Sequence, residues 1–222
     1  MRALKRFGKP DILQKKQKEW TDAFIASGKK RPDSSKYRNP NVLSSLRNIS
    51  HDKCFYCEAL LRHRPSEIDH RIEVSVDKSL AFEWTNLYLS CKECNDGRPK
   101  ETDIPIAEVL DPCSNTDAEI QEDITFDLYT IKGKTDRGKK TIQKFKLDNE
   151  GHETARMIHF IRMTEAITTI MTKDIYQNTG LKIIQCINDY DKETIMQFID
   201  SAEPYSLMCE VYLRKRYPQL FP

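Results

Sequence analysis

The order of hydrophobic and polar positions predicts helices in the first fifty residues. Residues 10–27 place most of their apolar side chains on one side of a helix, with Pro10 in the first turn and Gly28 at the end. The polar residues 29–39 predict a loop, and a second, shorter helix follows over residues 40–49. The chain therefore begins with a helical segment.

In the middle of the chain the pattern changes to short strands. Residues 67–74 alternate as a strand does, residues 77–85 predict a connecting loop, and residues 86–90 predict a second strand. A helix should follow, which Gly97 and Pro99 would cut short. The expected order is strand, strand, helix.

The rest of the chain is expected to be mainly helical after one more strand. Residues 101–112 predict acidic loops, and the alternation over residues 124–131 predicts a strand that ends at Gly133. Helical patterns then cover residues 151–177, 181–190, 194–199 and 205–216. We interpret the Met and Ile positions that recur every three to four residues as core faces.

These patterns divide the chain into three parts and indicate an α+β fold. Residues 1–50 are a basic helical segment, residues 51–100 a compact strand-strand-helix core, and residues 101–222 an acidic loop, a short strand and a helical region. With 38% hydrophobic and 32% charged residues the composition is that of a soluble globular protein. No apolar run approaches the length that spans a membrane, and the basic N-terminus does not lead into a signal-peptide segment, so we expect a cytoplasmic protein with no membrane partner.

Charge is distributed in blocks along the chain. Residues 2–31 are strongly basic, residues 101–127 contain nine carboxylates and no Lys or Arg, and residues 132–146 are basic again. Such blocks are usually solvated faces, although basic blocks would also attract the phosphates of a nucleic acid. The acidic block would repel nucleic acid and suits solvent or a protein partner.

Two C-x-x-C pairs predict a zinc site. In a reduced compartment four thiolates at this spacing indicate one tetrahedral zinc ion more often than incidental thiols. Because four thiolates leave no position for a substrate water, the zinc would be structural. The expected ligands are Cys54, Cys57, Cys91 and Cys94. We interpret Cys113, Cys186 and Cys209 as free thiols.

An Asp-His pair between the two cysteine pairs is the candidate catalytic centre. Asp69 offers a hard carboxylate ligand and Asn95 an amide oxygen for Mg²⁺ or Mn²⁺, and His70 would take a proton from the attacking water. In a regular strand Asp69 and His70 would point to opposite faces, so both reach one site only at a bulge or a strand end. The alternative for an isolated pair is a surface hydrogen bond.

These motifs resemble an HNH endonuclease of the zinc-braced kind. The resemblance covers about 50 of 222 residues, from Cys54 to Lys100. It implies a treble-clef-like ββα-metal fold surrounded by helices, with His70 as general base and Asp69 and Asn95 as ligands of the catalytic metal. It also implies that Asn86 fixes the loop through side-chain hydrogen bonds. Asn95 stands where the commonest family pattern has a histidine, and an amide still ligates Mg²⁺ but weakens binding of softer ions.

The flanking segments resemble the HNH proteins of retron and Septu antiphage systems. The basic N-terminus, the central core and the run from Thr141 to Asp148 followed by Arg156 share that layout. This resemblance implies an ABC-type ATPase partner, and in a retron also a reverse transcriptase with its nucleic acid. No Walker-type Gly-x-x-x-x-Gly-Lys motif occurs in the chain, so ATP dependence would come from a partner.

Several further charged side chains and histidines could contact phosphate, lie at the surface or have a structural role. Within the motif, we expect phosphate contacts from Arg71, Arg98 and Lys100. Glu73 is interpreted as a surface carboxylate. Arg62, His63 and Arg64 are interpreted as a basic hairpin tip that either contacts phosphate or is a surface feature. We interpret His51 as a surface residue and His152 and His159 as structural.

The main hypothesis is a metal-dependent endonuclease that cuts nucleic acid as the effector of a defence system. DNA is the preferred substrate in this hypothesis, ahead of RNA. One alternative is an HNH effector that cuts RNA such as tRNA. The other is a non-catalytic zinc module that binds nucleic acid or a protein. The combination of Asp69, His70 and Asn95 favours catalysis, because a binding module has no need of that set.

Overall fold

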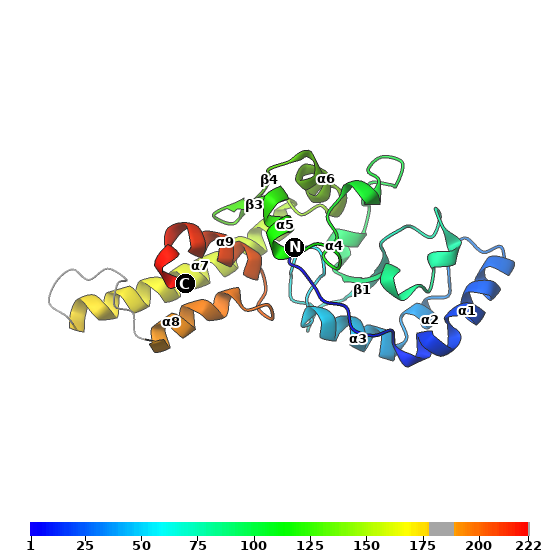
Figure 1. The fold of residues 1–222 in the computed structure, drawn as a ribbon, viewed down its shortest axis with the longest axis horizontal. Coiled ribbons are helices and arrows are strands. Elements are labelled where there is room, and N and C mark those ends of the chain that lie inside the picture. Colours follow the sequence, from blue (N-terminus) through cyan, green and yellow to red (C-terminus); the bar gives the residue numbers. More distant parts are fainter. Residues whose placement is uncertain (178–188, 222) are drawn as a thin grey trace.

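The first fifty residues form helices at one end of the molecule (Figure 1). The computed structural model describes residues 1–177 and 189–221. Its first helices are α1 (Asp11–Ala26), α2 (Ser34–Tyr37) and α3 (Pro40–Ser50). Helix α2 lies in the segment expected to be a loop. Its start is encoded locally, because the Asp33 side chain accepts a hydrogen bond from the Ser35 amide.

The central part has the expected strand-strand-helix order. Strands β1 (Glu67–His70) and β2 (Leu87–Ser90) pair antiparallel, with Glu67 opposite Ser90 and His70 opposite Leu87. Helix α4 (Lys92–Asn95) follows directly. Strand β1 ends four residues earlier than expected, at His70. The Ile72 amide donates to the Asn86 side chain and not to the backbone of a partner strand.

The third part begins with short elements that pack on this core. They are the 3₁₀ turn η3 (Ile106–Glu108), helix α5 (Asp117–Asp123), strands β3 (Ile124–Asp127) and β4 (Thr130–Gly133), and helix α6 (Asp136–Phe145). The expected single strand over residues 124–131 is wrong: it is a hairpin. The chain reverses at Leu128, which has a φ of 55°, and apolar alternation across a tight turn imitates one continuous strand.

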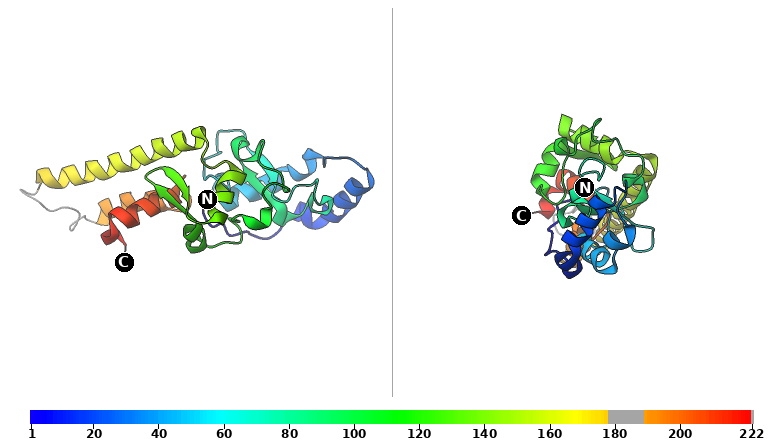
Figure 2. Two further views of the ribbon diagram at one scale, coloured as in Figure 1. Left: turned by 90° about the horizontal axis from the view of Figure 1, so that it is seen from above. Right: turned by 90° about the vertical axis from the view of Figure 1, so that its right-hand side faces the viewer.

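A helical arm extends from the rest of the molecule (Figures 1 and 2). It consists of α7 (Glu150–Gln177), α8 (Asp189–Met196) and α9 (Ser206–Arg216), with 3₁₀ turns at Gln197–Ile199 and Pro218–Leu220. Two of its helices agree closely with the expected ranges 151–177 and 205–216. The helical pattern over residues 181–190 lies almost entirely outside the described residues.

One hydrophobic core joins the three parts. The Tyr56 ring, which is fully buried, stacks on Phe145 with a centroid distance of 3.9 Å and lies parallel to Tyr88 at 5.9 Å. Tyr56 belongs to the first cysteine pair, Tyr88 to β2 and Phe145 to α6, so the aromatic stack connects the zinc module to the third part. In the described residues no helix combines the length and apolar character needed to cross a bilayer.

Candidate active site and zinc centre

The four cysteines of the two C-x-x-C pairs meet in the interior. All four are buried, and their sulfur atoms lie within 4.8 Å of one another. The Sγ atoms of Cys57 and Cys91 are 3.7 Å apart, close to the roughly 3.8 Å separation implied by a tetrahedral zinc with bonds of about 2.3 Å. The cluster therefore fits one structural zinc ion, as the spacing predicted.

The turn of the first pair and the start of α4 shape this cluster. Glu58 directly follows Cys57 with a φ of 65°, and its amide donates to the Cys54 carbonyl to close the turn. Cys91 is the N-cap of α4, which carries Cys94 in its first turn. Each pair is thus a local turn, and zinc would hold the two turns together.

A groove opens beside β1 and α4, with a volume of about 710 Å³. Among the residues that line it are Glu67, Asp69, His70, Asn95, Lys30 and Lys100. Asp69 and His70 both reach it because β1 ends at His70, so the strict alternation of a strand does not separate them. The structure thus brings the three candidate catalytic side chains to one cavity.

Asp69 is held in the groove wall by one of its two oxygens. Its carboxylate Oδ2 accepts hydrogen bonds from the Tyr56 hydroxyl and from Arg98 Nη1, each at 2.6 Å. No hydrogen bond to Oδ1 is present among the described residues, so this oxygen is available as a ligand. Burial and the charge of Asp69 raise the pKa of Tyr56 well above its usual value, which keeps the hydroxyl protonated as a donor.

The ring of His70 has a defined orientation. Its Nε2 atom lies 2.8 Å from the Ala81 carbonyl oxygen, and a carbonyl only accepts, so Nε2 carries the hydrogen and Nδ1 the lone pair. Tyr37 packs against the ring edge-on with a centroid distance of 4.9 Å. Burial lowers the pKa of His70, which favours the neutral form that can accept a proton.

Asn95 is the last residue of α4 and faces Glu67. Its Nδ2 donates to Glu67 Oε2 at 2.5 Å, which leaves its carbonyl Oδ1 free to ligate a metal. Sequence reasoning missed Glu67 as a member of the site. The signal was present, because Glu67 stands two residues before Asp69 on the same strand and so on the same side of the sheet.

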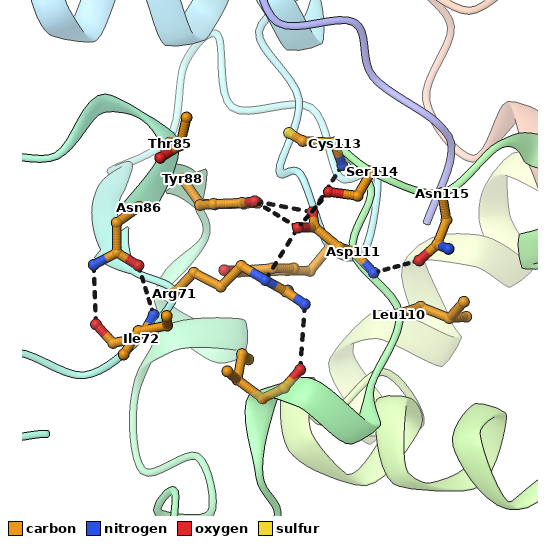
Figure 3. Close-up of polar contacts among 12 residues, drawn as sticks. Arg71, Ile72, Thr85, Asn86, Tyr88, Leu110, Asp111, Cys113, Ser114 and Asn115 are labelled. Atoms are coloured by element: carbon orange, nitrogen blue, oxygen red, sulfur yellow. Dashed lines mark hydrogen bonds and ion pairs between the residues drawn. The ribbon is translucent and has the colours of Figure 1, made fainter. Parts of the chain in front are cut away.

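Asn86 closes the loop between the two strands (Figure 3). Its Nδ2 donates to the Ile72 carbonyl at 3.0 Å, and its Oδ1 accepts from the Ile72 amide at 2.7 Å (Figure 3). Its Nδ2 also donates to the Leu80 carbonyl at 3.2 Å. The side chain is buried. This geometry is the loop-fixing arrangement implied by the resemblance, at a distance from the reacting groups.

Arg71 is placed differently from the expectation of a phosphate contact. It is 8% exposed, its Nε lies 3.3 Å from Asp111 Oδ2, and its guanidinium lies over the Tyr88 ring (Figure 3). Arg71 does not line the groove. We correct the expectation: a buried, paired guanidinium holds the acidic segment onto β2 and is not free to bind phosphate.

Arg98 also has an internal role, whereas Lys100 is exposed. Arg98 donates to Asp69 and, through Nη2, to the carbonyls of His70 at 2.7 Å and Arg71 at 3.2 Å. Its side chain is only 7% exposed and positions Asp69. We therefore correct the expectation that Arg98 binds phosphate: its contacts are structural. Lys100 is exposed at the groove.

Other groove residues come from distant segments. Lys30 and Arg31, in the loop after α1, line the groove together with Tyr37. The sequence marked the basic block but contained no spacing rule that would place these two at the site. Glu73, interpreted as a surface residue, lines the groove and lies 3.8 Å from Lys144 Nζ. The exposed residues of the hairpin tip, Arg62, His63 and Arg64, do not line it.

Comparison with known proteins agrees with this geometry. The family model described as HNH endonuclease matches residues 54–101. The chain is also 29% identical over 147 residues to the Septu protein PtuB of Bacillus thuringiensis, an alignment that covers 65% of this chain and 54% of that protein. The alignment thus spans about half the length of this relative. The match to the family model confirms, for residues 54–101, the HNH resemblance found in the sequence.

Proposed function

We propose that this chain is a metal-dependent endonuclease that cuts the phosphodiester bonds of DNA as an effector of an antiphage system. The observation that carries the proposal is the convergence of His70, Asp69 and Asn95 on one groove with basic residues at its rim. Similarity to PtuB supports the role in defence.

Each catalytic side chain has a distinct task in this proposal. His70 Nδ1 takes a proton from the water that attacks phosphorus, while the Ala81 carbonyl keeps the ring in the correct tautomer. Asp69 Oδ1 and Asn95 Oδ1 are hard oxygen donors suited to Mg²⁺ or Mn²⁺. Such an ion supplies charge neutralisation at the phosphate and at the leaving oxygen. Tyr56, Arg98 and Glu67 hold these ligands in place.

The groove rim suits a nucleic acid backbone. Lys30 and Arg31 come from the loop after α1, and Lys92 and Lys100 from α4 and the segment that follows it. Exposed cations from both segments would contact successive phosphates without reading sequence, so affinity should fall steeply with salt.

Cleavage assays with single histidine variants test the proposal. The purified full chain is incubated with DNA and, separately, RNA in Mg²⁺, with and without an ATPase partner. His70→Ala should lower the cleavage rate by about 10²–10⁴-fold. His63→Ala, a change at an exposed histidine outside the groove, should retain full activity. Cleavage of RNA alone would favour the alternative substrate. Equal rates for both variants would exclude His70 as the base, and no cleavage under any of these conditions would favour the non-catalytic zinc module.

We also propose that the chain acts with an ABC-type ATPase that docks on the arm. Ile158 and Ile161 are one turn apart on α7 and are 62% and 45% exposed. The acidic segment is a weaker candidate than its charge suggested, because Asp111 binds Arg71 and Glu101 accepts from the Ile106 amide. Two of its exposed carboxylates are Asp103 and Glu108.

Co-purification distinguishes the two surfaces. Capture of the ATPase should be lost in Ile158→Ser/Ile161→Ser and retained in Asp103→Asn/Glu108→Gln. The reverse pattern would place the interface on the acidic segment. Capture by both variants would contradict either location and point to the basic N-terminal helices.

A further inference from the structure

The first turn of α7 reaches the cysteine cluster. His152 is 4% exposed, and its Nε2 lies 3.3 Å from Cys94 Sγ. The His152 backbone amide donates to Asn149 Oδ1 at 2.9 Å, which fixes the turn that carries the ring. A histidine that the sequence marked only as structural thus contacts a predicted zinc ligand from a segment far away along the chain.

The chemistry of this contact decides which group is the hydrogen-bond donor. A metal-bound cysteine is a thiolate and has no proton to give, so the imidazole Nε2–H must be the donor. His152 is not a fifth ligand, because the group of atoms close enough to share one ion consists of the four cysteine sulfurs alone within the described residues. The ring therefore lies outside the metal's coordination and points at one of its ligands.

The surroundings make this contact more than general packing. A cavity of about 520 Å³ lies between the cysteine turns and α7, with Arg64, Lys92, Glu93 and Tyr205 in its walls. Side chains do not fill the space beside the ring, so apolar burial alone does not hold α7 to the second cysteine pair at this point. A hydrogen bond to a charged sulfur is stronger than one to a neutral thiol.

We propose that His152 couples the helical arm to the zinc centre. Zinc keeps Cys94 as a thiolate and so strengthens the bond that docks α7, and docking of α7 in turn stabilises zinc binding. Such coupling is reciprocal. Asn95, the proposed ligand of the catalytic metal, directly follows Cys94, so a partner bound to the arm has a short covalent path to the active groove. This proposal does not depend on the nuclease activity.

Zinc competition tests the coupling directly. The zinc-loaded full chain is titrated with a coloured chelator in three forms: wild type, His152→Phe and His159→Phe. His159 is the matched control, because it lies on the same helix, is 7% exposed, packs on Phe198 and Tyr205, and makes no hydrogen bond to a cysteine within the described residues. We expect zinc affinity to fall about 10–100-fold in His152→Phe, the range for groups that hydrogen-bond to metal ligands. It should be unchanged in His159→Phe.

A conservative variant and a spectroscopic probe separate the hydrogen bond from packing. His152→Gln keeps an N–H donor and should recover part of the lost zinc affinity. In wild-type protein loaded with ¹¹³Cd, a histidine ring N–H proton should correlate with the metal through the hydrogen bond, a measurement that needs no variant to fold. Equal zinc affinity in His152→Phe and His159→Phe would overturn the proposal, as would a visible His152 Nε2–H proton with no such correlation.

Discussion

Asp69 depends on neighbours that bind only one edge of its carboxylate. Tyr56 and Arg98 both donate to Oδ2, so the carboxylate is fixed in rotation while Oδ1 accepts no hydrogen bond within the described residues. An oriented ligand loses less conformational entropy when the metal binds. The hydroxyl of Tyr56, at the centre of an aromatic stack, therefore bears on metal binding as well as on stability.

We predict that Tyr56→Phe raises the Mg²⁺ concentration needed for half-maximal cleavage and lowers the free energy of unfolding by about 1 kcal/mol. The ring remains in the stack with Phe145, so the fold should persist. Tyr88→Phe is the control. It loses a hydrogen bond of 2.9 Å to Asp111 and should destabilise to a similar degree without changing the Mg²⁺ requirement. Identical metal titrations for the two variants would contradict the role given to Tyr56.

The low pKa of His70 predicts the pH dependence of cleavage. Burial lowers this pKa below the ordinary value of about 6.5, so the neutral base persists to lower pH and the rate should fall only as the pH drops through the lowered value. Tyr37→Ala exposes the ring and should move the acid limb up towards the ordinary value. Tyr190→Ala, a change at a side chain 77% exposed, should leave the profile unchanged. A limb that stays in place in Tyr37→Ala would show that the aromatic contact does not set this pKa.

At the scale of elements, short turns and caps are encoded locally and long pairings are not. The side chains of Asp33, Asn39 and Thr135 cap α2, α3 and α6 through hydrogen bonds to amides two or three residues away. Strand β1 ends at His70 because the Ile72 amide donates to the side chain of Asn86 and not to the backbone of a partner strand. Asn86 lies sixteen residues beyond His70 in the sequence. The sequence pattern of apolar positions continues beyond His70, and for this reason the predicted strand was too long.

A zinc ion at the four cysteines would hold two of these local turns together, and its removal should separate them. We predict one zinc per chain by elemental analysis and loss of cooperative melting in Cys91→Ser, because the cysteine turns, β2 and α4 share the site. Cys113→Ser, a change at a cysteine outside the cluster, should keep both the zinc and the transition. Protein purified without chelator that contains no zinc would contradict the assignment.

For the molecule as a whole, a buried lysine joins α6 to the segment that leaves the HNH domain. Lys144 is fully buried, and its Nζ donates to the carbonyls of Pro99 and Ile104, each at 2.8 Å, with Glu73 and Glu101 at 3.8 Å. Removal of this amine would leave two buried carbonyls without their donor.

We predict that Lys144→Met lowers the free energy of unfolding by about 2–3 kcal/mol, measured by denaturant titration. Lys140→Met is the comparison on the same helix. Lys140 pairs with Glu108 and Asp136 at the surface, where such contacts contribute about 0–1 kcal/mol. A loss of the same size in both variants would mean that the buried amine has no special role in attaching α6.

The sequence by itself determined the features that depend on short spacings. The four zinc ligands, the ββα order, the adjacency of Asp69 to His70 and the place of Asn95 after Cys94 follow from residues a few positions apart, since a turn, a strand or one helical turn brings such residues together in any context. The family resemblance then supplied the tasks of these side chains.

Only the tertiary structure decided which distant groups meet. It put Lys30 and Arg31 at the groove, turned Arg71 inward to Asp111, placed Arg98 and Tyr56 on Asp69, and brought His152 to Cys94. Charge marks a residue as able to bind phosphate, but whether it does so depends on burial and on the partner that packing supplies. That partner comes from another element, and no local spacing records which element will lie there.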